Sequence, residues 1–154
     1  MRRLLLFGSL ALFALVPSTL SAQWSLGGQL NYGTDFDFAL GARVAWGWPF
    51  EPGAETVASF DLFFPSDDFV DYWEVNININ QPLPLKTDQL NPYVGAGLNW
   101  AHITTSGASS NKFGLNLLAG LKYATPSVTP FGEVRAELGG GKQWVFTGGV
   151  MFIL

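Results

Sequence analysis

Cysteine is absent from the sequence, which excludes a small domain held together by disulfides and a lipid anchor on an N-terminal cysteine. Charge is also scarce. Only 13% of the residues are charged, whereas a small soluble domain usually covers its surface with about 25–35% charged residues. Basic residues are the rarest of these, with eight Lys and Arg against twelve Asp and Glu. Without a basic patch, the chain is not expected to bind nucleic acid.

Long apolar runs are confined to the N-terminus. Two arginines precede an uncharged apolar run over residues 4–16, and a proline and small residues up to Ala22 follow it. This order is typical of a cleavable secretory signal peptide, so we predict that residues 1–22 are removed and residues 23–154 form one domain. The run is too short for a membrane anchor, which needs about 20 apolar residues. The predicted mature part has six basic and twelve acidic residues, a net charge of −6.

Aromatic residues are abundant, at 15% of the chain, yet after the signal peptide no apolar stretch could cross a membrane as a helix. Apolar and polar residues instead alternate in eight segments separated by turn residues. The alternation is clearest over residues 73–80, where four residues of one row are Glu74, Asn76, Asn78 and Asn80. A strand places this row on one face, whereas a helix would scatter it. The predicted strands cover residues 23–32, 37–48, 56–64, 73–80, 93–100, 114–123, 131–138 and 143–154.

These segments predict an all-β protein, an eight-stranded antiparallel up-and-down transmembrane β-barrel. Most have the length that a tilted strand needs to cross a bilayer, and their number is even, as in single-chain bacterial barrels. A closed barrel also satisfies every backbone hydrogen bond in lipid. A soluble barrel of the lipocalin type alternates in the same way, however, with its apolar row inside. Which row faces outward must therefore be decided from other features.

Three features favour an apolar row that faces lipid. The polar row is mostly Asn, Gln, Ser and Gly, which suits a narrow packed interior better than a soluble surface. The last residue, Leu154, lies in the apolar row two positions after Phe152, a partial match to the C-terminal signal of the barrel-assembly machinery. Aromatic residues gather at the strand ends. With the N-terminus in the periplasm, they form two girdles: Trp24, Trp46, Trp48, Tyr123 and Phe152 on the periplasmic side, and Tyr32, Trp73, Trp100 and Trp144 on the outer side.

Several segments carry a family resemblance. The run PYVGAGLNW at residues 92–100 resembles a strand of the small outer-membrane barrels in the opacity-protein and OmpA/OmpW-like group. Residues 113–121, FGEVR at 131–135 and the ending 143–154 resemble the second half of that domain. The resemblance implies a barrel over residues 23–154 in the bacterial outer membrane. It also implies outer-membrane lipid and the export and barrel-assembly machinery as partners. That group is functionally mixed, so the resemblance implies no particular activity.

Charged residues in the inward row form the candidate site, a lumen charge network. The inward charges are Asp37, Arg43, Asp61, Glu74, Lys122, Glu133, Arg135 and Glu137. Charges inside a narrow barrel must pair, because a buried unpaired charge costs several kcal/mol. Neighbouring strands predict these pairings: Arg43 with Asp61, Lys122 with Glu133, and Arg135 with both Glu133 and Glu137. The network is either a filled polar core or a gate whose pairs switch to open a pore. The small space inside eight strands favours the filled core.

Catalytic and metal-binding patterns are weak. His102 is the only histidine and has outward parity. A lipid A deacylase of similar barrel size uses a lipid-facing His, a Ser two residues on, and a Glu. Here Thr104 stands in place of the Ser, and the next predicted strand contains no Glu. The acidic segment 65–71 lacks the glycine-containing ligand loop of a calcium site. We therefore expect no enzymatic activity, no metal and no cofactor.

Short predicted outer loops, at Gly33 and residues 65–71, 104–112 and 139–141, give little surface for an adhesin or receptor. We expect a monomeric outer-membrane barrel with a structural or small-solute permeability role and a filled polar lumen. The alternative is OmpW-like transport of small hydrophobic molecules across the outer membrane, and modification of lipid A comes third. A filled, ion-paired lumen would favour the structural role. A continuous apolar lumen with a lateral gap would favour transport.

Overall fold

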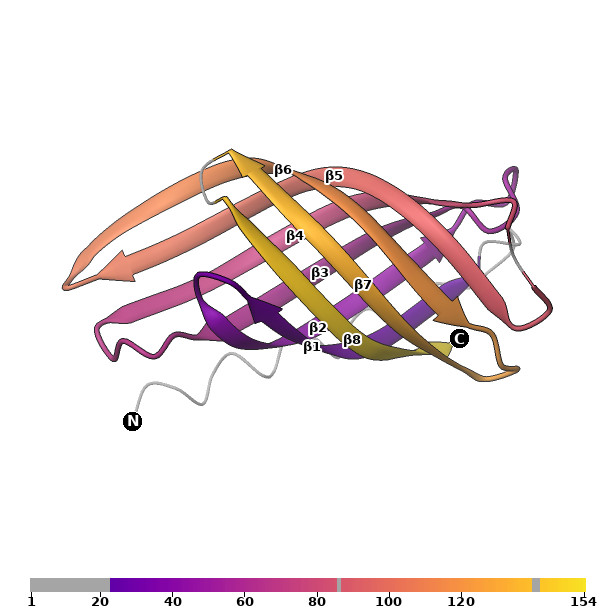
Figure 1. The fold of residues 1–154 in the computed structure, drawn as a ribbon, viewed down its shortest axis with the longest axis horizontal. Helices are drawn as coiled ribbons and strands as arrows, with labels where there is room; N and C mark the ends of the chain where they lie inside the picture. The colour runs from indigo at the N-terminus through magenta and orange to yellow at the C-terminus, as the bar shows by residue number, and fades with distance from the viewer. Residues whose placement is uncertain (1–22, 86, 140–141) are drawn as a thin grey trace.

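The chain folds into a closed barrel of eight antiparallel strands, as the alternation predicts (Figure 1). The computed structural model describes residues 23–85, 87–139 and 142–154, so the predicted signal peptide (residues 1–22) and part of the last turn lie outside the described residues. Each strand pairs with the next, and β1 pairs with β8 to close the sheet. The strands are β1 (Trp24–Gly33), β2 (Asp37–Gly47), β3 (Glu55–Phe64), β4 (Val70–Pro82), β5 (Leu90–Thr105), β6 (Ala108–Tyr123), β7 (Val128–Gly139) and β8 (Gln143–Ile153).

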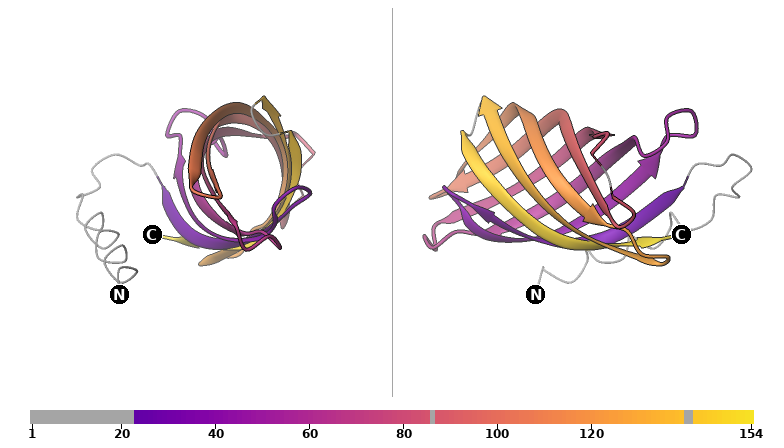
Figure 2. Two further views of the ribbon diagram at one scale, coloured as in Figure 1. Left: turned by 90° about the vertical axis from the view of Figure 1, so that its left-hand side faces the viewer. Right: turned by 45° about the vertical axis from the view of Figure 1, so that its right-hand side comes forward.

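The barrel has two different ends. The terminal end holds the start of β1 and the end of β8, and the distal end holds the β1–β2, β3–β4, β5–β6 and β7–β8 connections. In Figure 1 the distal end lies at the left, and Figure 2 (left) looks along the barrel into its ring of strands. No helix among the described residues is long and apolar enough to cross a membrane.

The β5–β6 hairpin corrects one prediction. Residues 104–112 were expected to form a loop, but β5 continues to Thr105 and β6 starts at Ala108. The turn is only Ser106 and Gly107, both with positive φ (49° and 86°), the conformation of a tight hairpin turn whose twist matches its strands. The Ser/Thr-rich flanks therefore pair instead of forming a loop. The hairpin reaches further from the barrel than the other distal connections (Figure 1).

The two faces of the sheet divide as the alternation predicts. Side chains of the apolar row lie on the outer surface, where Leu30 and Leu98 are 61% and 62% exposed. Side chains of the polar row point into the barrel, where Glu74 and Asn76 are fully buried. Soluble monomers rarely expose contiguous apolar patches of more than a few hundred Å². An apolar belt around the whole barrel therefore matches a surface that lies in lipid.

Aromatic side chains mark both rims of this apolar belt. At the terminal end, Trp24 stacks on Trp46 with 6.2 Å between ring centroids. At the distal end, Trp73 packs edge-on against Trp100 at 5.3 Å. Trp48 differs from the others because it lies beyond the end of β2, half-buried, where its Nε1 donates to Thr56 Oγ1 at 3.0 Å. The remaining residues of the two predicted girdles are exposed on the outer face: Tyr32, Tyr123, Trp144 and Phe152.

Candidate functional site: the barrel lumen

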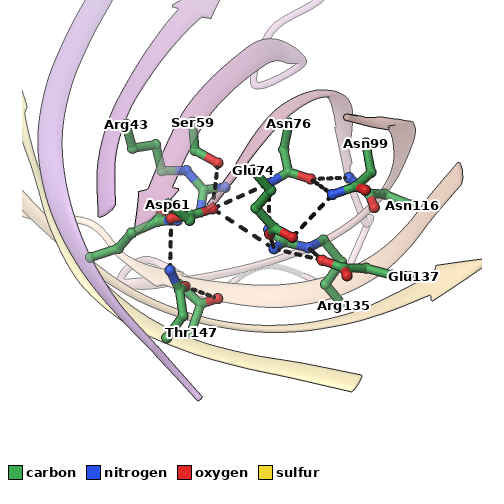
Figure 3. Close-up of polar contacts among 12 residues, drawn as sticks. Arg43, Ser59, Asp61, Glu74, Asn76, Asn99, Asn116, Arg135, Glu137 and Thr147 are labelled. Carbon is green, nitrogen blue, oxygen red and sulfur yellow. Dashed lines mark hydrogen bonds and ion pairs between the residues drawn. The ribbon is translucent and has the colours of Figure 1, made fainter. Parts of the chain in front are cut away.

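A cluster of four charged residues occupies the distal half of the lumen, and we call it the central cluster: Asp61, Glu74, Arg135 and Glu137. Arg135 comes from β7 and forms an ion pair with Glu74 on β4, across the barrel. Its Nε and Nη2 also lie 3.0 and 2.9 Å from Glu137 Oε1, and Nη2 is 3.8 Å from Asp61 Oδ2. Figure 3 shows the guanidinium between Glu74 and Glu137. One cation therefore connects three carboxyl groups from three strands.

Asp61 is almost entirely satisfied by neutral donors. Its Oδ1 accepts from Gln29 Nε2 at 2.6 Å and from Asn31 Nδ2 at 2.7 Å, and its Oδ2 accepts from Ser59 Oγ and Asn76 Nδ2, both at 3.1 Å. These donors are inward-row residues of β1, β3 and β4. Hydrogen bonds to a charged acceptor are about twice as strong as neutral ones. This shell, together with Arg135 at 3.8 Å, explains how Asp61 is accommodated with no exposed surface.

Asparagines connect the remaining wall to the central cluster. Asn99 on β5 donates to Glu74 Oε2 at 3.2 Å and to Asn76 Oδ1 at 2.9 Å. Asn116 on β6 donates to Asn76 Oδ1 at 2.8 Å and to Asn78 Oδ1 at 2.9 Å. The amides thus form a continuous hydrogen-bonded arc across β4, β5 and β6 (Figure 3). A connected buried polar network of this kind holds its members in one arrangement, and Asn116 Oδ1 is the one buried atom of these amides with no hydrogen-bond partner among the described residues.

A second ion pair, the lower pair, lies closer to the terminal end. Arg43 Nη2 on β2 contacts Glu133 Oε2 on β7 at 2.7 Å, and Tyr93 on β5 donates its hydroxyl to the same oxygen at 2.8 Å. Phe131 lies under the guanidinium, with 4.4 Å from Arg43 Cζ to the ring centroid. Arg43 Nη1 also donates to Gln29 at 3.2 Å, which links the lower pair to Asp61 of the central cluster.

Aromatic rings cover the central cluster at the distal end, and we call them the distal lid: Phe36, Phe63 and Tyr72. Phe36, in the β1–β2 turn, stacks on Tyr72 with 3.9 Å between ring centroids and 6° between planes. Phe63 packs edge-on against Tyr72 at 5.0 Å. The Tyr72 hydroxyl donates to Glu74 Oε2 at 3.1 Å, which ties the lid to the charges beneath it.

The terminal end is open by comparison. A cavity of about 770 Å³ lies at its mouth, and its lining includes Glu55, Tyr93, Lys122 and Met151. Lys122 on β6 forms an ion pair with Glu55 on β3, at the rim of this cavity. The terminal part of the lumen is therefore a closed-ended vestibule that stops at Tyr93 and the lower pair.

Three predicted pairings are wrong. Arg43 pairs with Glu133 instead of Asp61, and Lys122 pairs with Glu55 instead of Glu133. The guanidinium of Arg135 forms ion pairs with Glu74, Glu137 and Asp61 instead of with Glu133. The pairing of Arg135 with Glu137 is the one that the structure contains. The predicted pairings join residues of one strand or of adjacent strands. In a barrel this narrow, long side chains span the lumen and meet carboxylates on the opposite wall.

Asp37 has a separate place. It begins β2 with a positive φ of 61° and accepts hydrogen bonds from Ser66 N (3.0 Å) and Ser66 Oγ (2.6 Å) in the β3–β4 connection. It therefore joins two distal connections and takes no part in either ion-paired layer. In the acidic segment 65–71, Asp67 accepts from the backbone N–H of Phe69. Among the residues that the structure describes, no group of three or more Asp, Glu or His side chains is arranged to hold a metal ion.

Several solved structures of bacterial outer-membrane barrels are similar to this chain. The N-terminal β-barrel domain of Pseudomonas aeruginosa OprF is 22% identical, with a TM-score of 0.69, over 86% of this chain and 99% of that one. The fold is that of the small bacterial outer-membrane β-barrels. Neisserial surface protein A is 17% identical over 85% of this chain and 96% of its own, with a TM-score of 0.57. The Yersinia pestis attachment invasion locus protein Ail is 15% identical over 86% and 97%, with a TM-score of 0.54.

These similarities confirm the barrel resemblance that the sequence carries. No protein-family model matches the chain, and no curated protein matches it. The shared feature is thus an outer-membrane barrel fold at low sequence identity. The residues in the lumen have to be interpreted from their own geometry.

Several residues that line the lumen lie outside the predicted charge network. Glu55 lies one residue before the predicted start of β3, and Tyr72 lies one residue before the predicted start of β4, so neither belongs to the predicted inward row. Tyr93 was placed in the polar row without a role, although a tyrosine that faces a polar interior usually finds a hydrogen-bond partner. Phe36 stood in a predicted turn, where no alternation indicates which way a side chain points. The sequence does indicate the orientation of Tyr93 and Glu55, because both alternate in step with the inward-facing row of their strands.

A glycine makes room for Tyr93, and this predicts a measurable effect. Tyr93 lies directly across from Gly120 in the β5–β6 register, and a Cβ on Gly120 would lie 2.3 Å from Tyr93 Cζ. Gly120→Ala should therefore push the ring away from Glu133 and lower the free energy of unfolding by about 1–3 kcal/mol. Urea titration of the protein in vesicles, followed by tryptophan fluorescence, measures this change.

Gly148 provides the matched control, because a Cβ there would meet no atom within 4 Å. Gly148→Ala on the outer face of β8 should leave the unfolding midpoint close to that of the unmodified protein. Equal midpoints for the Gly120 and Gly148 variants would show that the close packing of Tyr93 on Gly120 contributes nothing to stability.

Proposed function

We propose that this protein is a structural barrel of the bacterial outer membrane whose lumen is closed to solutes. One observation carries the proposal. From the distal end inward, the lumen holds the distal lid, the central cluster and the lower pair, whose side chains contact one another and are buried except for the half-buried Phe36. Free passage would require all three layers to rearrange together.

The same fold supports a proposal for location and partners. The apolar belt and the aromatic rims support insertion in the outer membrane, with outer-membrane lipid as the surrounding partner and with delivery by the export and barrel-assembly machinery. An acidic chain without a basic patch supports the absence of a nucleic-acid partner. We further propose that the protein is a monomer without catalytic activity, since the charged side chains of the lumen are engaged in ion pairs with one another.

Transport of small hydrophobic molecules has less support. Such a path needs an apolar lumen and a lateral opening in the wall. The distal half of this lumen is lined by carboxylates, one arginine and amides. The seam between β1 and β8 is paired along nine residue positions, from Ser25 to Gly33. The geometry therefore favours the structural role over lateral transport.

Single-channel recording in a planar bilayer tests the proposal. We expect stable insertion, checked by the heat-dependent gel mobility of the folded barrel, without discrete conductance steps. Reproducible steps from the unmodified protein would contradict a closed lumen.

Variants of the lower pair and central cluster separate a filled lumen from a gate. Glu133→Ala or Arg135→Ala removes one layer of contacts, and the other layers remain in place. A filled lumen should stay closed in both variants. Conductance that appears in inserted Glu133→Ala or Arg135→Ala protein would instead favour a gate operated by these ion pairs.

A further inference from the structure

The outer face of the β4–β5–β6 sheet carries a polar patch above the distal aromatic rim. The pairing register arranges this face in rows across the three strands. The lowest row is Val75, Trp100 and Phe113, the next is Trp73, His102 and Asn111, and the highest is Asp71, Thr104 and Ser109. We call the five polar members the rim patch: Asp71, His102, Thr104, Ser109 and Asn111.

Side-chain contacts connect four residues of the rim patch, His102, Asn111, Thr104 and Ser109. His102 Nδ1 lies 2.8 Å from Asn111 Oδ1, and His102 Nε2 lies 3.3 Å from Thr104 Oγ1, which is in turn 2.9 Å from Ser109 Oγ. The Trp73 ring stacks against the imidazole at 5.0 Å and 22°. With both ring nitrogens and one face engaged, the imidazole connects the polar groups to the aromatic rim.

Aromatic rings lie directly beneath the patch. Trp100 stacks on Phe113 with 6.2 Å between centroids and 8° between planes, and Trp73 packs against Trp100. Phe113 is 73% exposed. Flat, exposed rings beside a row of hydroxyl and amide groups match the two surfaces of a sugar ring, which has an apolar face and a polar edge. Small-ligand sites commonly combine aromatic contact with a few placed polar groups.

The place of the patch indicates the occupant. Aromatic belts lie at the level of lipid headgroups, and the rim patch continues the same outward-facing rows just beyond that level. It faces sideways, toward neighbouring lipids. None of the nine residues in these rows is Lys or Arg, so the patch suits neutral hydroxyl groups better than phosphate.

We propose that the rim patch binds a sugar of a glycolipid headgroup in the same leaflet of the membrane. This inference rests on the proposed location in the outer membrane. The sugar ring packs on Trp73, Trp100 and Phe113. Its hydroxyls hydrogen-bond to Asn111, Ser109 and Thr104, whose hydroxyl and amide groups each have further donor or acceptor capacity. The acyl chains of the same molecule lie against the apolar belt below.

The test counts the glycolipid molecules that stay bound to the protein. The purified full chain is equilibrated in detergent micelles that contain deep-rough lipopolysaccharide or, separately, phosphatidylethanolamine, and native mass spectrometry measures the lipid retained. The double variant Thr104→Val, Asn111→Leu removes polar groups from the patch while keeping apolar bulk. Losing two hydrogen bonds should lower the affinity for the glycolipid by about tenfold or more.

Trp144→Leu is the matched control, because Trp144 belongs to the distal aromatic rim on β8 and lies outside the rim patch. We expect this variant to retain the glycolipid as the unmodified protein does, and we expect phosphatidylethanolamine binding to be the same in all three proteins. Equal glycolipid retention in the double variant and the unmodified protein would overturn the proposal.

Two other results would also overturn it. Displacement of the bound glycolipid by a soluble disaccharide headgroup alone would show that the patch binds free glycans. Release of a fatty acid from the glycolipid, abolished by His102→Ala, would show hydrolysis in place of binding. Heat-dependent gel mobility of each variant, measured in the same micelles, reports the folded barrel. A protein that fails to fold in micelles would contradict the proposed membrane location, whereas a folded barrel without selective retention contradicts the rim patch alone.

Discussion

Arg135→Met should lower the free energy of unfolding by about 3–5 kcal/mol, which is the usual cost of removing one partner from a buried ion pair. Arg135 is 1% exposed and is the cation that contacts Glu74, Glu137 and Asp61. Without it, three carboxyl groups from opposite walls face one another in a closed space. Urea unfolding of the protein in vesicles measures the loss.

Lys122→Met is the control for this prediction. Its ion pair with Glu55 lies at the terminal rim, where the lysine side chain is 23% exposed. A pair with access to water is worth about 1 kcal/mol or less. The double variant Arg135→Met, Glu74→Gln should recover part of the lost stability, because one of the opposed carboxylates becomes neutral. Similar losses for the Arg135 and Lys122 variants would contradict the idea that the central cluster is the main polar element of the lumen.

Leu117→Arg should destabilise the barrel by about 2–4 kcal/mol, the cost of a charged side chain on the lipid face near the bilayer midplane. Leu117 is 53% exposed on the outer face of β6, about midway between Phe113 at the distal rim and Tyr123 at the terminal rim. In lipid vesicles this arginine must reach the interface or draw water into the bilayer. The expected result is a lower unfolding midpoint and slower insertion.

Ser110→Arg on the same strand is the matched control. Ser110 lies in the β5–β6 hairpin beyond the distal rim and is exposed, so an arginine there should stay in water at little cost. A soluble barrel would tolerate both substitutions equally, since surface changes away from special features usually stay within about 0.5 kcal/mol. Equal stability of the two variants would therefore contradict a lipid-facing outer row.

Alternation was enough to predict the strands and their faces, because a strand places residues two apart on the same side. The Asn row of β4 faces the lumen for this reason. The same periodicity carries no information about partners across the lumen. Arg43 has Ser59 as its neighbour on β3, but its long side chain reaches Glu133 on β7. Such pairings depend on the diameter of the barrel and on the rotamers of long side chains.

Turns were predicted less well than strands. Ser106-Gly107 is a dipeptide of the kind that closes tight hairpins, but the surrounding Ser and Thr residues suggested a long loop. Phe36 is a second residue whose position the sequence did not predict, because its ring lies in a turn and packs on Tyr72. Packing against a distant residue decided that orientation. The distal lid was therefore visible only in the structure.

Tryptophan quenching by brominated lipids tests the central claim, that an apolar belt bounded by aromatic rims faces lipid. The six tryptophans lie toward the two ends of the barrel: Trp24, Trp46 and Trp48 on the terminal side, and Trp73, Trp100 and Trp144 on the distal side. We expect strong quenching by lipids brominated near the headgroup end of the acyl chain and weak quenching by lipids brominated near its methyl end. Absence of quenching by either lipid, or stronger quenching from the bilayer centre, would contradict this placement of the barrel in the membrane.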